Sequence, residues 1–158
     1  MRKQKGFSLI ELLIVVAIIL IIAAIAVPNL LRSRMAANEA SAVGTVRTIN
    51  TAQVTYSTTY PAIGYTGIGA LGGATPCTPG VATACIVDPL VSSGAQTKSG
   101  FTFASVAAAG NPSIQFTVNA NPVTFGSTGL RNFFSDESFV IRYSTTGNPA
   151  AVTDAALQ

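Results

Sequence analysis

The feature that most constrains this chain is an uninterrupted apolar run near its N-terminus. Phe7 to Val27 spans 21 residues with one charged side chain, Glu11, and a proline follows directly. At a rise of about 1.5 Å per residue, a helix over this run would cover about 31 Å, close to the hydrocarbon thickness of a bilayer. Three basic residues precede the run: Arg2, Lys3 and Lys5. Their charge favours a cytoplasmic N-terminus.

Two general interpretations explain part of this segment. An ordinary secretory signal peptide would be cleaved at a small-x-small site, for which Ala24-Ile25-Ala26 is available, but the apolar run is longer than a usual signal. A single-pass membrane anchor explains the length. Neither explains Glu11, because an acidic side chain at that depth costs about 2.5–3.5 kcal/mol on insertion scales.

A third interpretation explains all parts together. The sequence G-F-S-L-I-E-L-L-I-V-V-A-I-I behind a short basic leader closely resembles the N-terminal signal of type IV pilins and of the pseudopilins of type II secretion. The resemblance implies that a prepilin peptidase cleaves between Gly6 and Phe7 and N-methylates Phe7, so that the apolar segment stays in the product. Glu11 matches the glutamate of that family, and Pro28 matches its helix-kinking proline.

Glu11 is predicted to set the register of assembly. Cleavage would create a positive α-amine at Phe7, and among packed apolar helices this amine and Glu11 of a neighbouring chain would each need a partner. At about 4 Å and an effective dielectric of about 20, the pair attracts by roughly 4 kcal/mol. A subunit in the wrong register would leave both charges unpaired, at a cost of about 3–5 kcal/mol. The alternative is a charge tolerated near the membrane interface.

Residues 28–60 are predicted to continue the helix with one apolar face. Apolar and aromatic side chains recur there at spacings of three and four, at Val43, Val46, Ile49, Ala52, Tyr56 and Tyr60. The polar side chains of Arg34, Glu39, Arg47 and Asn50 lie mostly off that stripe. Pro61 is predicted to end the helix, and Pro28, which lacks an N–H, to bend it or unwind it locally.

Residues 61–99 are dense in Gly and Pro and are predicted to form a long irregular connection. Cys77 and Cys85 lie within it and are the two cysteines of the chain. Beside a membrane-targeting N-terminus, they are predicted to form a disulfide in an oxidising compartment, with two free thiols as the alternative. The chain has no His to complete a metal site with them.

From Phe101 onward the apolar period becomes two, which is typical of half-buried strands. Alternation predicts strands at Phe101–Phe103, Ile114–Val118 and Phe139–Tyr143. Leu130–Phe134 is predicted as a fourth strand, paired with the last across a turn at Ser135–Ser138. An antiparallel sheet over about residues 100–145 follows, and the small, polar C-terminal residues are predicted to be loosely ordered.

The expected fold is therefore α+β, with a long N-terminal helix packed on a C-terminal antiparallel sheet. The predicted parts are a cleaved leader, an apolar membrane and filament-core half-helix, an amphipathic half-helix and a globular head: residues 1–6, 7–27, 28–60 and 61–158.

Composition argues against several other functions. The formal net charge of +3 becomes close to zero without the basic leader. The remaining chain therefore lacks the broad basic surface that is typical of nucleic-acid binding. The residues offer no general base of the His type, no phosphate-binding glycine loop and no cofactor motif, so no enzyme is predicted. Asp136, Glu137 and Asp154 could in principle bind calcium, but a solvated turn is the preferred interpretation.

These predictions combine into a structural subunit of the major pilin type that polymerises with itself. The resemblance implies an inner-membrane precursor, a cell-surface filament, and a prepilin peptidase, motor ATPase and platform protein as partners. A pseudopilin of a secretion system is the first alternative, and a secreted binding domain with an ordinary signal peptide is the second. Adhesion, motility, DNA uptake and electron conduction are all compatible with the sequence.

Overall fold

A computed structural model describes residues 7–157, and its first element is one long helix, α1, from Leu9 to Thr59. Residue contacts divide the chain into two parts after Arg34. We describe these parts separately, as the N-terminal segment and the head.

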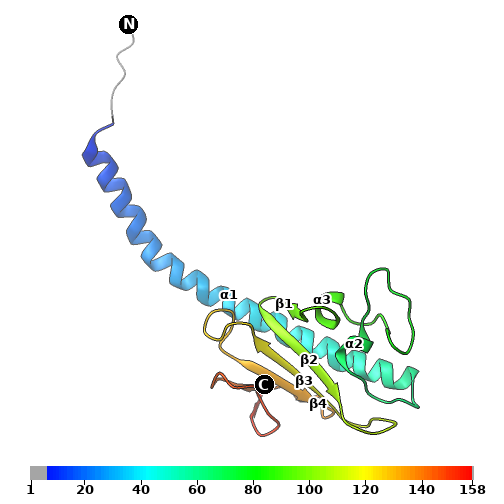
Figure 1. Ribbon diagram of the computed structural model, residues 1–158. Helices are drawn as coiled ribbons and strands as arrows, with labels where there is room; N and C mark the ends of the chain where they lie inside the picture. Colours follow the sequence, from blue (N-terminus) through cyan, green and yellow to red (C-terminus); the bar gives the residue numbers. More distant parts are fainter. Residues whose placement is uncertain (1–6, 158) are drawn as a thin grey trace. The chain divides into compact units, whose positions relative to one another are not determined.

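The head contains an antiparallel sheet in which sequence neighbours pair in the order β1 to β6. The strands are β1 (Thr97–Lys98), β2 (Phe101–Ala107), β3 (Phe116–Pro122), β4 (Asn132–Asp136), β5 (Arg142–Ser144) and β6 (Ala155–Ala156). The part of α1 that belongs to the head runs along one face of β2, β3 and β4 (Figure 1). This helix-on-sheet arrangement confirms the predicted α+β class.

The helix buries the stripe that its spacing predicts. Val46, Ile49, Ala52 and Tyr56 are almost fully buried, and the last member of the stripe, Tyr60, is partly buried against the same core. Alternate residues of the strands supply the other side of this core: Phe101, Phe103, Phe116, Val118, Ala120 and Phe133. Each large apolar side chain removed from water here contributes about 1.5–3 kcal/mol to folding.

Two buried amides on α1 attach the helix to one row of the sheet. The Asn50 amide donates to the Ser135 hydroxyl over 2.8 Å, and the Gln53 amide donates to the Ser105 hydroxyl over 2.9 Å. Strand register places both serines opposite Val118, so they lie in one row across three strands. The placement of Asn50 off the buried stripe was wrong, because these hydroxyls satisfy its amide inside the core.

Glu39 is the second polar residue that the helix pattern placed wrongly. Its side chain is buried, and its carboxylate accepts hydrogen bonds from the backbone N–H groups of Leu130 and Arg131 over 2.7 and 3.1 Å. The Arg131 guanidinium donates to the same carboxylate over 2.8 Å. The two residues directly before β4 are thereby attached to α1. The charge of Glu39, which the helix pattern assigned to solvent, is part of the head's structure.

The predicted last strand begins later than the alternation suggested. Phe139 is not in a strand: its N–H donates to the Asp136 carbonyl over 2.9 Å, and it adopts φ +59° in a turn. The Asp136 carboxylate accepts the Ser138 N–H over 3.0 Å, which is the geometry of an Asx turn. The strand therefore starts at Arg142, and Asp136 ends β4 instead of lying in the turn.

The C-terminal residues are more ordered than predicted. β6 pairs with β5, aligning Ala155 with Tyr143 and Ala156 with Arg142. The Leu157 N–H then donates to the Ile141 carbonyl over 2.7 Å. Backbone pairing supplies the order that small side chains alone do not predict.

The connection between α1 and the sheet holds short elements that Gly and Pro density obscured. They are α2 (Ile68–Leu71), α3 (Pro89–Ser92) and β1. Cys77 and Cys85 form the predicted disulfide. The Tyr56 hydroxyl donates to the Val81 carbonyl over 2.7 Å, so α1 also holds the backbone inside the disulfide loop.

Asp88 stabilises the start of α3 and gives a testable pH dependence. Its carboxylate accepts the Leu90 N–H over 2.9 Å and binds the Lys98 ammonium over 3.1 Å. The Leu90 hydrogen bond, followed by that of Lys98, lowers the pKa of Asp88 below its usual 3.8. Because the pKa is lower in the folded state, this stabilisation is complete well above the ordinary pKa and is lost as the pH falls through the folded value.

We therefore expect Asp88→Asn to lower the free energy of unfolding at neutral pH and to have a smaller effect at about pH 2. Urea unfolding of the full chain in detergent, followed by tyrosine fluorescence, measures both differences. An equal loss at the two pH values would show that the carboxylate charge is not the source of the stabilisation.

Candidate assembly site

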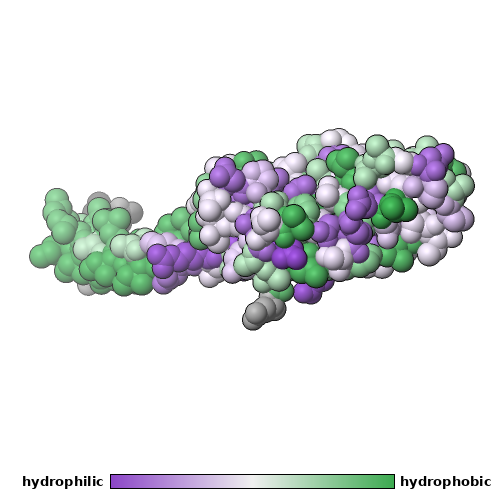
Figure 2. Space-filling view, turned by 90° about the horizontal axis from the view of Figure 1, so that it is seen from below, coloured by the Kyte–Doolittle hydropathy of each residue, from purple (hydrophilic) through white to green (hydrophobic). Residues whose placement is uncertain are grey.

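The N-terminal segment exposes a long apolar surface. Large apolar side chains between Phe7 and Leu31 are 46–81% exposed, and α1 is long and apolar enough to cross a membrane. Figure 2 shows this segment as a nearly continuous hydrophobic surface, whereas the visible face of the head is mixed. Contiguous exposed apolar area of this kind marks a surface that contacts lipid or another protein.

Glu11 lies in the first turn of α1, where the structure gives it a local partner. The Ser8 N–H, one residue before the helix, donates to Glu11 Oε2 over 2.9 Å. This contact is one half of a capping box, in which a glutamate at the third helical position satisfies the N–H of the residue before the helix. The negative charge also faces the positive end of the helix dipole. The spacing S-x-x-E at Ser8 to Glu11 is the sequence signal of this capping contact.

The other residues predicted to take part in processing are Gly6 and Phe7. Gly6 and the basic leader residues lie outside the described part of the chain. Phe7 is 81% exposed at the start of the described part. The cleavage and methylation assigned to Gly6 and Phe7 stay predictions.

Pro28 lies inside α1, and the helix continues through it. Because proline has no N–H, the Ala24 carbonyl has no backbone donor at the usual helical position. The local unwinding that was one of the two predicted effects of Pro28 does not occur in this structure. The missing hydrogen bond nevertheless weakens the helix at this turn.

The three acidic residues that the sequence offers for calcium have separate hydrogen-bond partners. Asp136 binds the backbone and hydroxyl of Ser138, Glu137 accepts from the Gln115 amide over 3.2 Å, and Asp154 accepts the Ala151 N–H over 2.8 Å. Within residues 7–157, no group of three His, Cys, Asp or Glu side chains is arranged to hold a metal.

Known proteins resemble parts of this chain. A protein-family model described as the prokaryotic N-terminal methylation motif matches residues 1–27. The type IV wide pilus major component PilA4 of Thermus thermophilus is 64% identical over 39 residues, which cover 25% of this chain and 30% of that protein. The type IV major pilin protein PilA of Myxococcus xanthus is 43% identical over 54 residues, which cover 34% of this chain and 24% of that protein.

These similarities are local. Each match spans less than a third of the length of the curated relative, and no solved structure matches the chain significantly. The N-terminal segment carries the prokaryotic N-terminal methylation motif, and the chain is similar over 39 and 54 residues to two major subunits of type IV pili.

Proposed function

We propose that this chain is a structural subunit of a type IV pilus-like filament, held together through the apolar half of α1. The observation that carries the proposal is the exposed apolar surface from Phe7 to Leu31 in a segment with the methylation motif. Burying each large aliphatic side chain of this surface contributes about 1.5–3 kcal/mol. A bilayer covers the surface before assembly, and neighbouring copies cover it in the filament.

The methylation motif supports the following order of events. A prepilin peptidase removes residues 1–6 and methylates Phe7, while the inner membrane holds the apolar half-helix. Motor and platform proteins then move the subunit into a growing fibre at the cell surface. The disulfide between Cys77 and Cys85 fits a head that is folded in an oxidising compartment. The role is structural, not enzymatic.

The names of the relatives favour a pilus over a secretion pseudopilus. Both are major pilus subunits by name, and the identity to the first of them reaches 64% over 39 residues.

Filaments sheared from the native host test this function. We expect them to contain this chain as their main protein, and deletion of its coding sequence should remove them from the cell surface. A soluble extracellular monomer without the apolar segment would support the secreted binding domain instead. A chain confined to the membrane fraction, with unchanged surface filaments in the deletion strain, would contradict a pilus role.

A further inference from the structure

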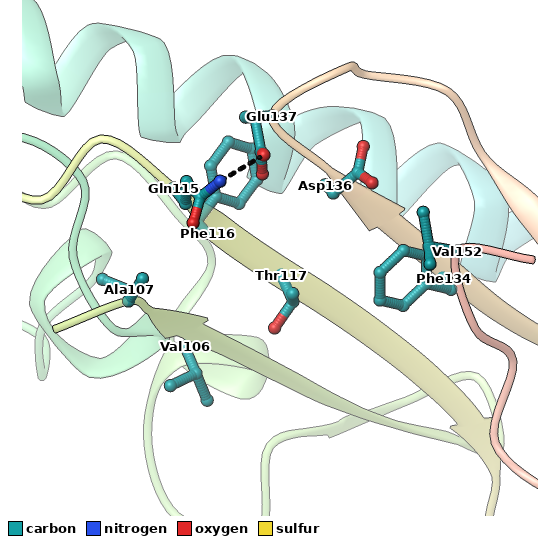
Figure 3. Close-up of a pocket in the computed structure, with 10 residues that line it drawn as sticks. Val106, Ala107, Gln115, Phe116, Thr117, Phe134, Asp136, Glu137 and Val152 are labelled. Atoms are coloured by element: carbon teal, nitrogen blue, oxygen red, sulfur yellow. Dashed lines mark hydrogen bonds between the residues drawn. The ribbon is translucent and has the colours of Figure 1, made fainter.

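The head carries a groove on the face of the sheet opposite to α1. Strand register aligns Val106, Thr117 and Asp136 in one row across β2, β3 and β4. These residues line a groove of about 340 Å³, and Figure 3 shows α1 behind the sheet from this side. The groove is thus separate from the core that joins helix and sheet.

The floor of the groove is apolar and partly exposed. Val106 is 63% exposed and Val152 is 55% exposed, whereas Phe134 between them is buried. Figure 3 shows Val152 against the Phe134 ring and Val106 at the other end of the groove. An apolar floor of this kind gains free energy when aliphatic side chains of a partner cover it.

One rim of the groove is acidic. Asp136 and Glu137 line it side by side, and neither forms an ion pair within the described residues. Glu137 is exposed, with the Gln115 amide as its hydrogen-bond partner. No Lys or Arg is among the described residues that line the groove. The chemistry of the groove therefore fits a partner that presents aliphatic side chains beside a cation.

The chain itself contains such a segment. Most basic residues of the head are engaged: Lys98 with Asp88, Arg131 with Glu39, and Arg142 with the Asp154 carbonyl. The exposed arginines that form no ion pair within residues 7–157 are Arg32, Arg34 and Arg47.

Arg34 differs from Arg47 in its neighbours. Leu30 and Leu31 are 54% and 53% exposed, and they lie four and three residues before Arg34 on the same face of α1. At the same spacings before Arg47 lie Val43, which is buried in the head, and Gly44, which has no side chain. Leu30, Leu31 and Arg34 thus form an exposed helical surface that is apolar at one end and positive at the other.

We propose that this surface of one copy docks in the acidic groove of a second copy, with Leu30 and Leu31 over the apolar floor and Arg34 beside Asp136 and Glu137. The proposal rests on the proposed function, because it assigns a contact between subunits of the filament. A helix laid in a groove is a common recognition mode, and the charge pair fixes its position. The same contact would hold the heads at the filament surface in a defined register.

A charge exchange tests this contact in cells that carry no wild-type copy. Glu137→Lys alone and Arg34→Glu alone should each lower the yield of sheared filaments by about tenfold or more, because each places like charges together. The double variant, with both substitutions, should recover most of the wild-type yield. The matched control joins Glu137→Lys with Arg47→Glu, which has the same net charge and should stay poorly assembled.

A cysteine pair provides a measurement that does not depend on charge. Filaments of a chain with Glu137→Cys and Arg34→Cys should yield disulfide-linked ladders on oxidation, and the pair Glu137→Cys with Arg47→Cys should not. Membrane levels of each variant, with Cys77 and Cys85 protected from thiol reagents, show that the heads are folded. If Arg47→Glu restores the filament yield of Glu137→Lys as well as Arg34→Glu does, the proposed contact is wrong. Normal filament yield from the folded single variants would also overturn it. Absence of wild-type filaments would overturn the proposed function, and this contact with it.

Discussion

Glu11→Ala is expected to leave the chain in the membrane and processed, but to reduce its assembly by about a hundredfold or more. The α-amine at Phe7 would lose its partner among packed apolar helices, which costs about 3–5 kcal/mol, and each 1.4 kcal/mol is a factor of ten in an equilibrium. Filament yield relative to the processed membrane pool measures the effect, with no wild-type subunit present.

The capping contact of Glu11 requires a control of its own. Glu11→Gln keeps an oxygen that can accept the Ser8 N–H, which now donates over 2.9 Å, but it removes the charge. If Glu11 acts through charge, the glutamine variant assembles as poorly as the alanine variant. Normal assembly of Glu11→Gln would assign the whole effect to the start of the helix and contradict the register role.

Glu39→Ala is expected to destabilise the head by about 3 kcal/mol, because it leaves two backbone N–H groups and a guanidinium without their shared acceptor. The Glu39 carboxylate is only 8% exposed, whereas Arg131 is 36% exposed and can recover some hydration. Urea unfolding of the full chain in detergent, followed by the fluorescence of the head's tyrosines, measures the loss.

Two variants separate charge from burial in this contact. Glu39→Gln keeps one acceptor for the N–H groups of Leu130 and Arg131, and we expect it to lose less stability than the alanine variant. Asp88→Ala breaks the exposed pair with Lys98, where both side chains are at least 37% exposed. Its effect should be much smaller than that of Glu39→Ala, and comparable losses would contradict the importance assigned to burial.

The regular parts of the fold were predictable because their signals are local. The stripe from Val43 to Tyr56 repeats with the helical period, and the strand around Phe101 alternates with period two. The disulfide followed from the pair Cys77 and Cys85 beside a membrane-targeting segment. Each of these inferences uses residues close together in the sequence.

The misplaced residues depend on partners far away in the chain. Asn50 and Glu39 are buried because Ser135 and Arg131, 85 and 92 residues later, satisfy their polar atoms. A helical pattern has no means of showing such partners, so it assigns polar side chains to solvent. Phe139 fits the alternation by residue type, but the Asx turn at Asp136 sets its backbone to φ +59°.

The candidate assembly site also has one part with a local sequence signal and another part that depends on residues far apart in the chain. Glu11 and Pro28 could be placed from sequence because the motif is contiguous, and the structure adds the Ser8 contact at the start of α1. The acidic groove required the fold, since Val106, Asp136 and Val152 come from three distant parts of the chain. Alternation marked Asp136 only as part of a turn and left Val152 in a tail.

The intact mass and N-terminal sequence of the protein in filaments from its native host test the central claim most directly. Processing for assembly predicts a chain that begins at Phe7, is heavier by one methyl group and keeps the complete apolar half-helix. A chain that begins at Val27 would show that the apolar segment is discarded, and it would contradict polymerisation through α1.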